Sequence, residues 1–195
     1  MKFIETRIKD LFIIEPQVFR DTRGCFFESY NKSVFEKAGL YYKFVQDNRS
    51  ESVYGVIRGL HFQIGEYSQA KLVTVISGKV LDVAVDLRKE SPTFGQYVSV
   101  ELSGENKRMF MIPRGFAHGF SVLSDKVSFF YKCDNVYHKP SERGLRFNDP
   151  SINIDWIIPT ESAILSEKDK VLPFLCEIKK NDNLYLMQCF LRGFS

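Results

Sequence analysis

The chain of 195 residues contains few cysteines and histidines and has no long apolar run. Its four cysteines lie far apart and form no paired spacing, which excludes the usual patterns of a disulfide framework or a zinc site. We therefore expect reduced thiols at Cys25, Cys133, Cys176 and Cys189. No stretch approaches the roughly 20 apolar residues that a membrane-spanning helix needs, so we expect no membrane association.

The chain also has no large excess of positive or negative charge. The chain has 27 basic and 24 acidic residues, a net charge of +3, and no basic run or arm, which argues against nucleic-acid binding. The first residues, Met1–Arg7, are too charged for a signal peptide, so we expect a cytoplasmic protein. A hydrophobic content of 44% and 18 phenylalanines are typical of a globular protein with one sizeable core.

Most of the sequence has the pattern of short strands separated by turns, which predicts a β sandwich or barrel. One strand places Val83, Val85 and Leu87 on one face and Asp82 on the other. We expect an apolar strand before it to enter a hairpin at Ser77-Gly78. The predicted strands are Lys71–Ile76, Lys79–Leu87, Tyr97–Leu102, Arg108–Ile112, Gly119–Leu123 and Val127–Cys133.

Only a few short helices are expected. Ser33 and Glu36 form a capping box, and Gly39 provides the stop signal. A second helix is predicted to begin at Ser166. Residues 176–195 have no regular pattern and are interpreted as a C-terminal tail or an added edge element of unknown role.

The first candidate chemistry lies in the stretch Arg58–Gln63 and at Lys71. About forty ångströms of extended chain separate Arg58 from Lys71, so a folded loop can bring both cations to His61. A neutral imidazole beside fixed cations can remove a proton from carbon while the cations stabilise the oxyanion. The alternatives are a buried structural histidine and a Lys71 ammonium that reaches the surface.

Tyr131 shares a strand face with Val127, Phe129 and Cys133. A tyrosine on an apolar face needs a hydrogen-bond partner or an opening to water. It is either a core aromatic or, if it faces the imidazole across a cavity, a general acid.

Metal binding is not expected. Pro113–His118 resembles the second motif of the cupin superfamily, in which a histidine often binds metal. The first cupin motif needs a His-x-His pair, but here the sequence is His61-Phe62-Gln63, so one ligand is missing. His118 is therefore interpreted as a polar contact.

Seven sequence blocks follow one another along roughly residues 1–173: Phe19–Tyr30, Phe44–Asn48, Arg58–Gln63, Ser91–Gln96, Ile112–Phe120, Tyr131–Cys133 and Leu165–Asp169. In this order and spacing they resemble the dTDP-4-dehydrorhamnose 3,5-epimerase family. The resemblance implies a cupin-type jelly-roll fold in a single domain, residues 1–175. It also implies a homodimer in which residues 1–30 are exchanged between protomers.

The resemblance further implies an isomerase that needs no cofactor and acts on a dTDP-4-dehydro-6-deoxyhexose, on the route to dTDP-L-rhamnose. By this resemblance His61 is the base, Asp169 is its partner and Tyr131 is the acid on the opposite sugar face. Lys71 would face the C4 oxygen. The implied substrate contacts are Arg23, Phe26, Glu28, Gln46, Asp47, Asn48, Arg58, His118, Tyr137, Glu142 and Lys168.

Two positions depart from the family pattern. Arg49 stands where a histidine is more usual, and Pro140 lies one residue closer to Glu142 than expected. The sequence also leaves other functions open. These are a one-centre epimerase that inverts only C3 or C5, a metal-dependent cupin oxygenase and a non-catalytic sugar-binding cupin.

Overall fold

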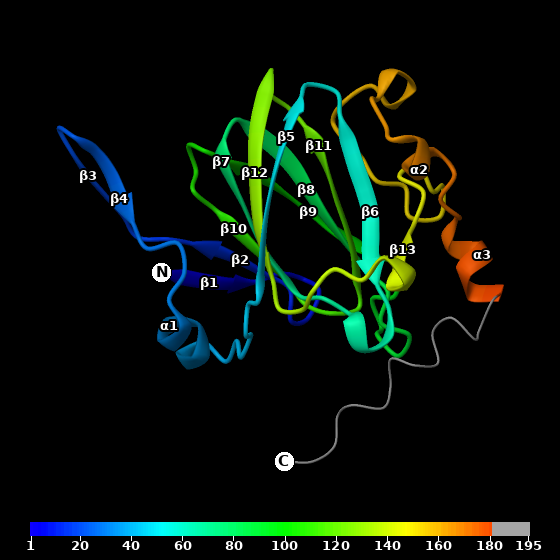
Figure 1. The fold of residues 1–195 in the computed structure, drawn as a ribbon, viewed down its shortest axis with the longest axis horizontal. Coiled ribbons are helices and arrows are strands. Elements are labelled where there is room, and N and C mark those ends of the chain that lie inside the picture. Colours follow the sequence, from blue (N-terminus) through cyan, green and yellow to red (C-terminus); the bar gives the residue numbers. More distant parts are fainter. Residues whose placement is uncertain (181–195) are drawn as a thin grey trace, which may run out of the picture.

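The computed structural model describes residues 1–180, which form two antiparallel sheets packed face to face (Figure 1). The six-stranded sheet has the order β1-β2-β10-β7-β12-β5. Its strands are β1 (Lys2–Glu5), β2 (Phe12–Glu15), β10 (Met109–Ile112), β7 (Lys71–Ser77), β12 (Lys126–Cys133) and β5 (Gln46–Val53).

The second sheet has five strands in the order β13-β6-β11-β8-β9. These are β13 (Glu142–Gly144), β6 (Ile57–Gln63), β11 (Phe116–Val122), β8 (Lys79–Asp86) and β9 (Tyr97–Ser103). Between the sheets lies a core to which Val73 on β7, Val80 on β8 and Phe120 on β11 contribute. The expected mainly β jelly roll with a few short helices is confirmed.

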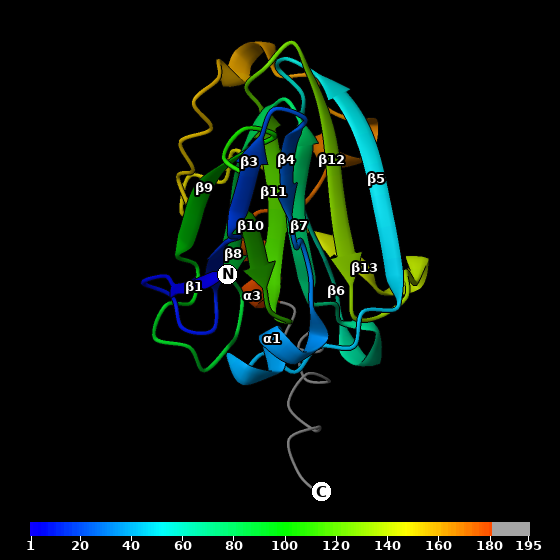
Figure 2. The ribbon, with the colours of Figure 1, turned by 90° about the vertical axis from the view of Figure 1, so that its left-hand side faces the viewer.

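A separate two-stranded hairpin consists of β3 (Val18–Asp21) and β4 (Gly24–Phe27). It extends away from both sheets in Figure 1 and points toward the viewer in Figure 2. Its aromatic side chains are strongly exposed, since Phe19 is 56% and Phe26 is 71% accessible. The hairpin therefore contributes little to the core of its own chain.

The prediction that Lys71–Ile76 and the next strand form a hairpin is wrong. β7 pairs with β10 and β12, whereas β8 pairs with β9 and β11, so the chain changes sheet between them. Gly78 makes this crossing at φ +80°, where an added Cβ would lie 2.1 Å from the carbonyl oxygen of Lys126. A glycine at the end of a strand thus indicates a turn, but it does not indicate whether the strands on either side of the turn pair with each other.

The helices are α1 (Lys32–Lys37), α2 (Glu167–Lys170) and α3 (Leu175–Lys180). Asn31, not Ser33, is the N-cap of α1, because its side chain accepts the N–H groups of Ser33 and Val34. The stop at Gly39 (φ +81°) is confirmed. Single turns of 3₁₀ helix lie at Gly65–Tyr67, Lys139–Ser141 and Thr160–Ser162.

Within the described part of the chain no helix is long and apolar enough to cross a membrane. α3 occupies the start of the segment interpreted as a tail, and Leu175 and Ile178 pack against the core beneath the five-stranded sheet. The remainder of that segment, residues 181–195, lies outside the described residues.

Candidate active site

A cavity of about 650 Å³ opens between the two sheets. β6 and β11 of the five-stranded sheet form one wall, and β5, β7 and β12 of the six-stranded sheet form the other. The segment 164–169, which ends in α2, closes one side. Eight of the predicted site residues line this cavity: His61, Lys71, Tyr131, Asp169, Asn48, Arg58, His118 and Lys168.

His61 and Asp169 form the closest pair of ionisable groups in the cavity. The Nε2 of His61 lies 2.7 Å from Oδ1 of Asp169, and the carboxylate is only 3% exposed while the ring is 26% exposed. Burial disfavours the charge of Asp169, yet the hydrogen bond with His61 and the N–H of Gly59 hold the pKa of this carboxyl below its usual range. An ionised carboxylate only accepts hydrogen bonds, so Nε2 carries the ring proton and Nδ1 remains free to take another.

Local sequence explains how this pair is positioned. Ser166 caps α2 by accepting the N–H of Asp169 at 3.1 Å, which fixes the aspartate in the first turn. β6 and β11 lie so close together here that a Cβ added at Gly59 would be 2.6 Å from the Cα of Gly119. Glycines at both positions allow β6 to carry His61 against the cavity wall.

His118 lies on β11 directly opposite His61 on β6. Its Nε2 is 3.1 Å from each carboxylate oxygen of Asp82, and both side chains are buried, at 7% and 0% exposure. Burial lowers the pKa of the His118 ring, which Asp82 opposes, and burial raises the pKa of Asp82, which His118 and Lys71 oppose. The second histidine, like the first, is thus bound to a buried carboxylate.

The six-stranded sheet supplies the ammonium of Lys71 and the phenol of Tyr131. The two lie side by side, with Nζ 5.8 Å from the ring centroid. Burial lowers the pKa of Lys71, while Cys133, Asp82 and Glu142 favour its charge. Burial raises the pKa of Tyr131 to about 12, so its hydroxyl keeps its proton at neutral pH.

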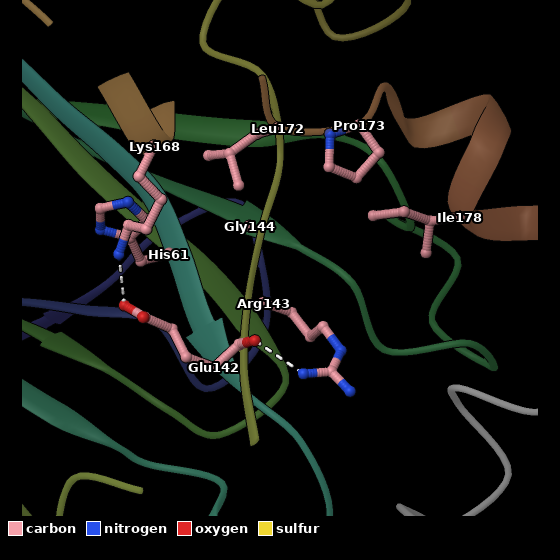
Figure 3. Close-up of a pocket in the computed structure, with 8 residues that line it drawn as sticks. All are labelled: His61, Glu142, Arg143, Gly144, Lys168, Leu172, Pro173 and Ile178. Carbon is pink, nitrogen blue, oxygen red and sulfur yellow. Dashed lines mark hydrogen bonds and ion pairs between the residues drawn. The ribbon is translucent and has the colours of Figure 1, made fainter. Parts of the chain in front are cut away.

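A chain of polar contacts borders the cavity next to His61. Glu142 on β13 accepts a hydrogen bond from the Lys168 ammonium at 2.7 Å and from the Tyr137 hydroxyl at 3.1 Å. Burial raises the pKa of Glu142, but Lys168 and Tyr137 outweigh this and hold it below its usual range. Figure 3 shows the Lys168 ammonium on Glu142, beside His61, at a smaller pocket of about 260 Å³.

The remaining predicted residues lie in three places. Gln46 lies at the rim, where it accepts the backbone N–H of Tyr137 at 2.8 Å and donates to Asn48 at 3.0 Å. Asp47 lies on the exposed face of β5 and binds Lys132 at 2.8 Å, so the structure does not bring it to the cavity. Arg23, Phe26 and Glu28 are on or next to the projecting hairpin and line none of the pockets described.

Sequence reasoning missed two residues that support the site. One is Asp82, which the strand pattern placed on the face opposite Val83 and Val85. Its position in the middle of a mostly apolar strand was the signal that could have indicated a buried, hydrogen-bonded carboxylate. Gln63, noted only as a missing metal ligand, donates to the carbonyls of Tyr67 and Val136 and accepts the N–H of His138. It therefore holds the loop that carries Tyr137.

In residues 1–180 no three histidine, cysteine, aspartate or glutamate side chains lie close enough to hold a metal ion. The cavity instead combines a histidine–aspartate pair and a protonated phenol with an excess of cations, among them Arg58, Lys71 and Lys168. Such a site can remove and return a proton on a substrate that carries negative charge. Fold and site together define an acid–base enzyme of the cupin type.

Comparisons with known proteins identify the family. Residues 5–177 match the sequence model of dTDP-4-dehydrorhamnose 3,5-epimerase. The dTDP-4-dehydrorhamnose 3,5-epimerase of Shigella flexneri is 56% identical over 170 residues, which cover 87% of this chain and 93% of that protein. The chain therefore belongs to the dTDP-4-dehydrorhamnose 3,5-epimerase family, and it is an epimerase.

Solved structures agree with this assignment. The dTDP-4-dehydrorhamnose 3,5-epimerase of Elizabethkingia anophelis is 56% identical with a TM-score of 0.88, covering 91% of this chain and 97% of that one. The dTDP-6-deoxy-D-glucose-3,5-epimerase of Legionella pneumophila, solved with dTDP-4-keto-L-rhamnose, is 49% identical with a TM-score of 0.89. That match covers 94% of this chain and 96% of the Legionella chain.

Proposed function

We propose that this chain inverts C3 and C5 of dTDP-4-dehydro-6-deoxy-D-glucose and so forms dTDP-4-dehydro-L-rhamnose. The observation that carries the proposal is the His61–Asp169 pair on one wall of the cavity and the protonated Tyr131 on the other. The Legionella relative, solved with dTDP-4-keto-L-rhamnose, supports the sugar assignment.

The base is His61. C3 and C5 both flank the C4 ketone, so loss of a proton from either carbon gives an enolate that places negative charge on the C4 oxygen. His61 takes this proton on Nδ1 and becomes an imidazolium, which the buried Asp169 carboxylate stabilises at 2.7 Å. Lys71, on the opposite sheet, faces the developing oxyanion as a fixed cation.

The acid is Tyr131. It donates its hydroxyl proton to the enolate carbon from the other face, which restores the ketone with the centre inverted. The phenolate then regains a proton from solvent as the imidazolium loses one, so each inversion leaves the protein unchanged. With a pKa of about 12, the phenol is fully protonated before each cycle.

The nucleotide half of the substrate binds toward the mouth of the cavity. Arg58 and Lys168 supply positive charge for the diphosphate, and Asn48 supplies an amide. Tyr137 is 52% exposed, and its hydroxyl is held by Glu142, so its ring is free to stack on the thymine.

The site takes its remaining contacts from a second copy of the chain. The β3–β4 hairpin projects from the sheets, and Phe26 is 71% exposed, a solvent exposure that is unfavourable for an aromatic ring. In a homodimer the hairpin delivers Arg23, Phe26 and Glu28 to the partner's cavity. The protein acts in the cytoplasm, which the free thiols of Cys25, Cys133 and Cys176 favour.

The test is product stereochemistry. Purified enzyme is incubated with dTDP-4-dehydro-6-deoxy-D-glucose, and the configuration at C3 and C5 is determined by proton NMR coupling constants. Inversion of both centres supports the proposal. Inversion of one centre would instead indicate a one-centre epimerase, and an unchanged sugar would refute both functions.

A further inference from the structure

The carboxylate of Asp82 lies in the apolar interior, where a negative charge is unfavourable. It is completely buried on β8, and its neighbours on the same strand face, Val80 and Ala84, belong to the core between the sheets. A buried charge is tolerated when it is paired and hydrogen-bonded. Its hydrogen-bond partner is the ring of His118, which lines the cavity, so the carboxylate lies directly behind a site residue.

The register of the sheet makes this arrangement rigid. His118 pairs with Ala84 and Phe120 pairs with Asp82 in the antiparallel β8–β11 ladder, so histidine and aspartate are diagonal neighbours on one face. The ring of Phe129 lies nearly parallel to the imidazole, with ring centroids 6.2 Å apart and planes 19° apart. The His118 ring is therefore fixed by Asp82 behind it and Phe129 beside it.

We propose that Asp82 is a positioning residue that orients the His118 ring in the cavity and supplies negative charge close to Lys71, which faces the oxyanion at C4. The proposal rests on the proposed function. Asp82 donates no proton and touches no substrate, since its side chain has no exposed surface. It acts through the two groups in front of it, His118 by hydrogen bonds and Lys71 by charge.

The negative charge of Asp82 favours the protonated form of Lys71. Burial lowers the pKa of Lys71 below its ordinary value of 10.5, and the groups that favour its charge are Cys133, Asp82 and Glu142. His118 and Tyr131 also face Lys71, from β11 and β12. Burial raises the pKa of Tyr131 to about 12 and that of Cys133 to about 11 but lowers that of Lys71, so of these three groups Lys71 should lose its proton first as the pH rises. We expect this loss to limit activity at alkaline pH.

Asp82→Asn tests the inference, because it keeps the shape of the side chain and removes the negative charge. We expect kcat to fall about tenfold or more with KM little changed, since Arg58, Lys168 and Asn48 still bind the nucleotide half. The alkaline limb of the kcat/KM profile should move to lower pH by about half a unit or more, because Lys71 has lost a nearby anion. Asp82→Ser carries the same prediction and replaces Asp82→Asn if that variant does not fold.

Asp86→Asn is the matched control. Asp86 lies on the same strand and is equally buried, but its partners are Arg88, Ser91 and Thr93, away from the cavity. This variant should lose stability and keep the alkaline limb of the wild type. If Asp82→Asn also loses only stability, with kcat and the limb unchanged, Asp82 is merely structural. If the wild type itself does not turn over the sugar, the proposed function fails instead.

Discussion

His61 and His118 are direct partners across the antiparallel β6–β11 ladder, and each is held by a buried aspartate from a different element. His61 binds Asp169 of α2, while His118 binds Asp82 of β8. The two rings nevertheless have different exposures, since 26% of His61 and 7% of His118 is accessible. The more exposed ring is the one that can reach a carbon-bound proton, so we assign the base to His61.

Replacement of this base should stop turnover without unfolding the protein. We expect His61→Asn to lower kcat by about 10²–10⁴-fold, the usual contribution of a general base, and to keep dTDP binding nearly intact. Steady-state rates and calorimetric titration with dTDP measure the two effects. His138→Gln is the control, because that histidine stacks on Tyr67 outside the cavity, with centroids 3.8 Å apart, and should keep the wild-type kcat. More than about one hundredth of the wild-type rate in His61→Asn would contradict the assignment.

Tyr131→Phe separates an acid from a core aromatic. The variant keeps the ring and its packing, so a core role predicts nearly normal inversion and a modest change in stability. An acid role predicts that His61 still removes the proton, exchanges it with solvent and returns a deuteron to the same face. Solvent deuterium then enters unreacted substrate while inverted product fails to accumulate. Both species are followed by NMR in deuterated water. Tyr97→Phe, whose hydroxyl accepts the Asp155 N–H outside the cavity, should behave as wild type.

A mixing experiment tests whether the hairpin completes the partner's site. A protein with Arg23→Ala and Phe26→Ala should fold normally, since both side chains are exposed, but bind substrate poorly. His61→Asn is inactive for a different reason. If protomers exchange hairpins, a refolded mixture of the two contains dimers with one intact site and regains activity. A mixture no more active than the sum of its parts would exclude a shared site.

The Asp86 cluster predicts how stability depends on pH. Burial disfavours the Asp86 charge, but hydrogen bonds from Arg88, Ser91 and Thr93 hold its pKa below the usual value. The carboxylate therefore stabilises the fold above the pKa of the unfolded chain, about 3.9, and this contribution is lost as the pH falls below it. Asp86→Asn should lower the free energy of unfolding by about 1–3 kcal/mol at pH 7. Its stability should then change less than that of the wild type between pH 5 and 2, as urea titrations would measure; parallel curves would contradict this.

The sequence predicted strands well because their signal is local. Alternating apolar residues placed β8 and β9 within about a residue of their ends. Pairing is not local, and the expected hairpin after Lys71–Ile76 was wrong because Gly78 carries the chain from one sheet to the other. The helix start was predicted two residues too late, since Asn31 rather than Ser33 is the N-cap and accepts the N–H groups of Ser33 and Val34.

The site was predicted only in part, because some of its contacts join residues that are far apart along the chain. His61, Lys71 and Tyr131 stood out by residue type and context, and their convergence in one cavity required three strands from two sheets. The role of Asp169 came from the family resemblance alone, because nothing near residue 169 indicates a contact with residue 61. Asp82 was missed because its partner is 36 residues away along the chain. Asp47 stays a prediction, since it pairs with Lys132 and does not line the cavity.

In the proposed reaction His61 removes a proton from C3 and from C5, and Tyr131 delivers a new one to each carbon from the opposite face. The most direct test is the mass and NMR spectrum of the product formed from dTDP-4-dehydro-6-deoxy-D-glucose in deuterated water, with His61→Asn as the blank for spontaneous exchange. We expect an inverted product with one deuteron at C3 and one at C5. An inverted product that carries solvent deuterium at neither carbon would contradict it, because the proton delivered to each new centre would not have come from a group that exchanges with water.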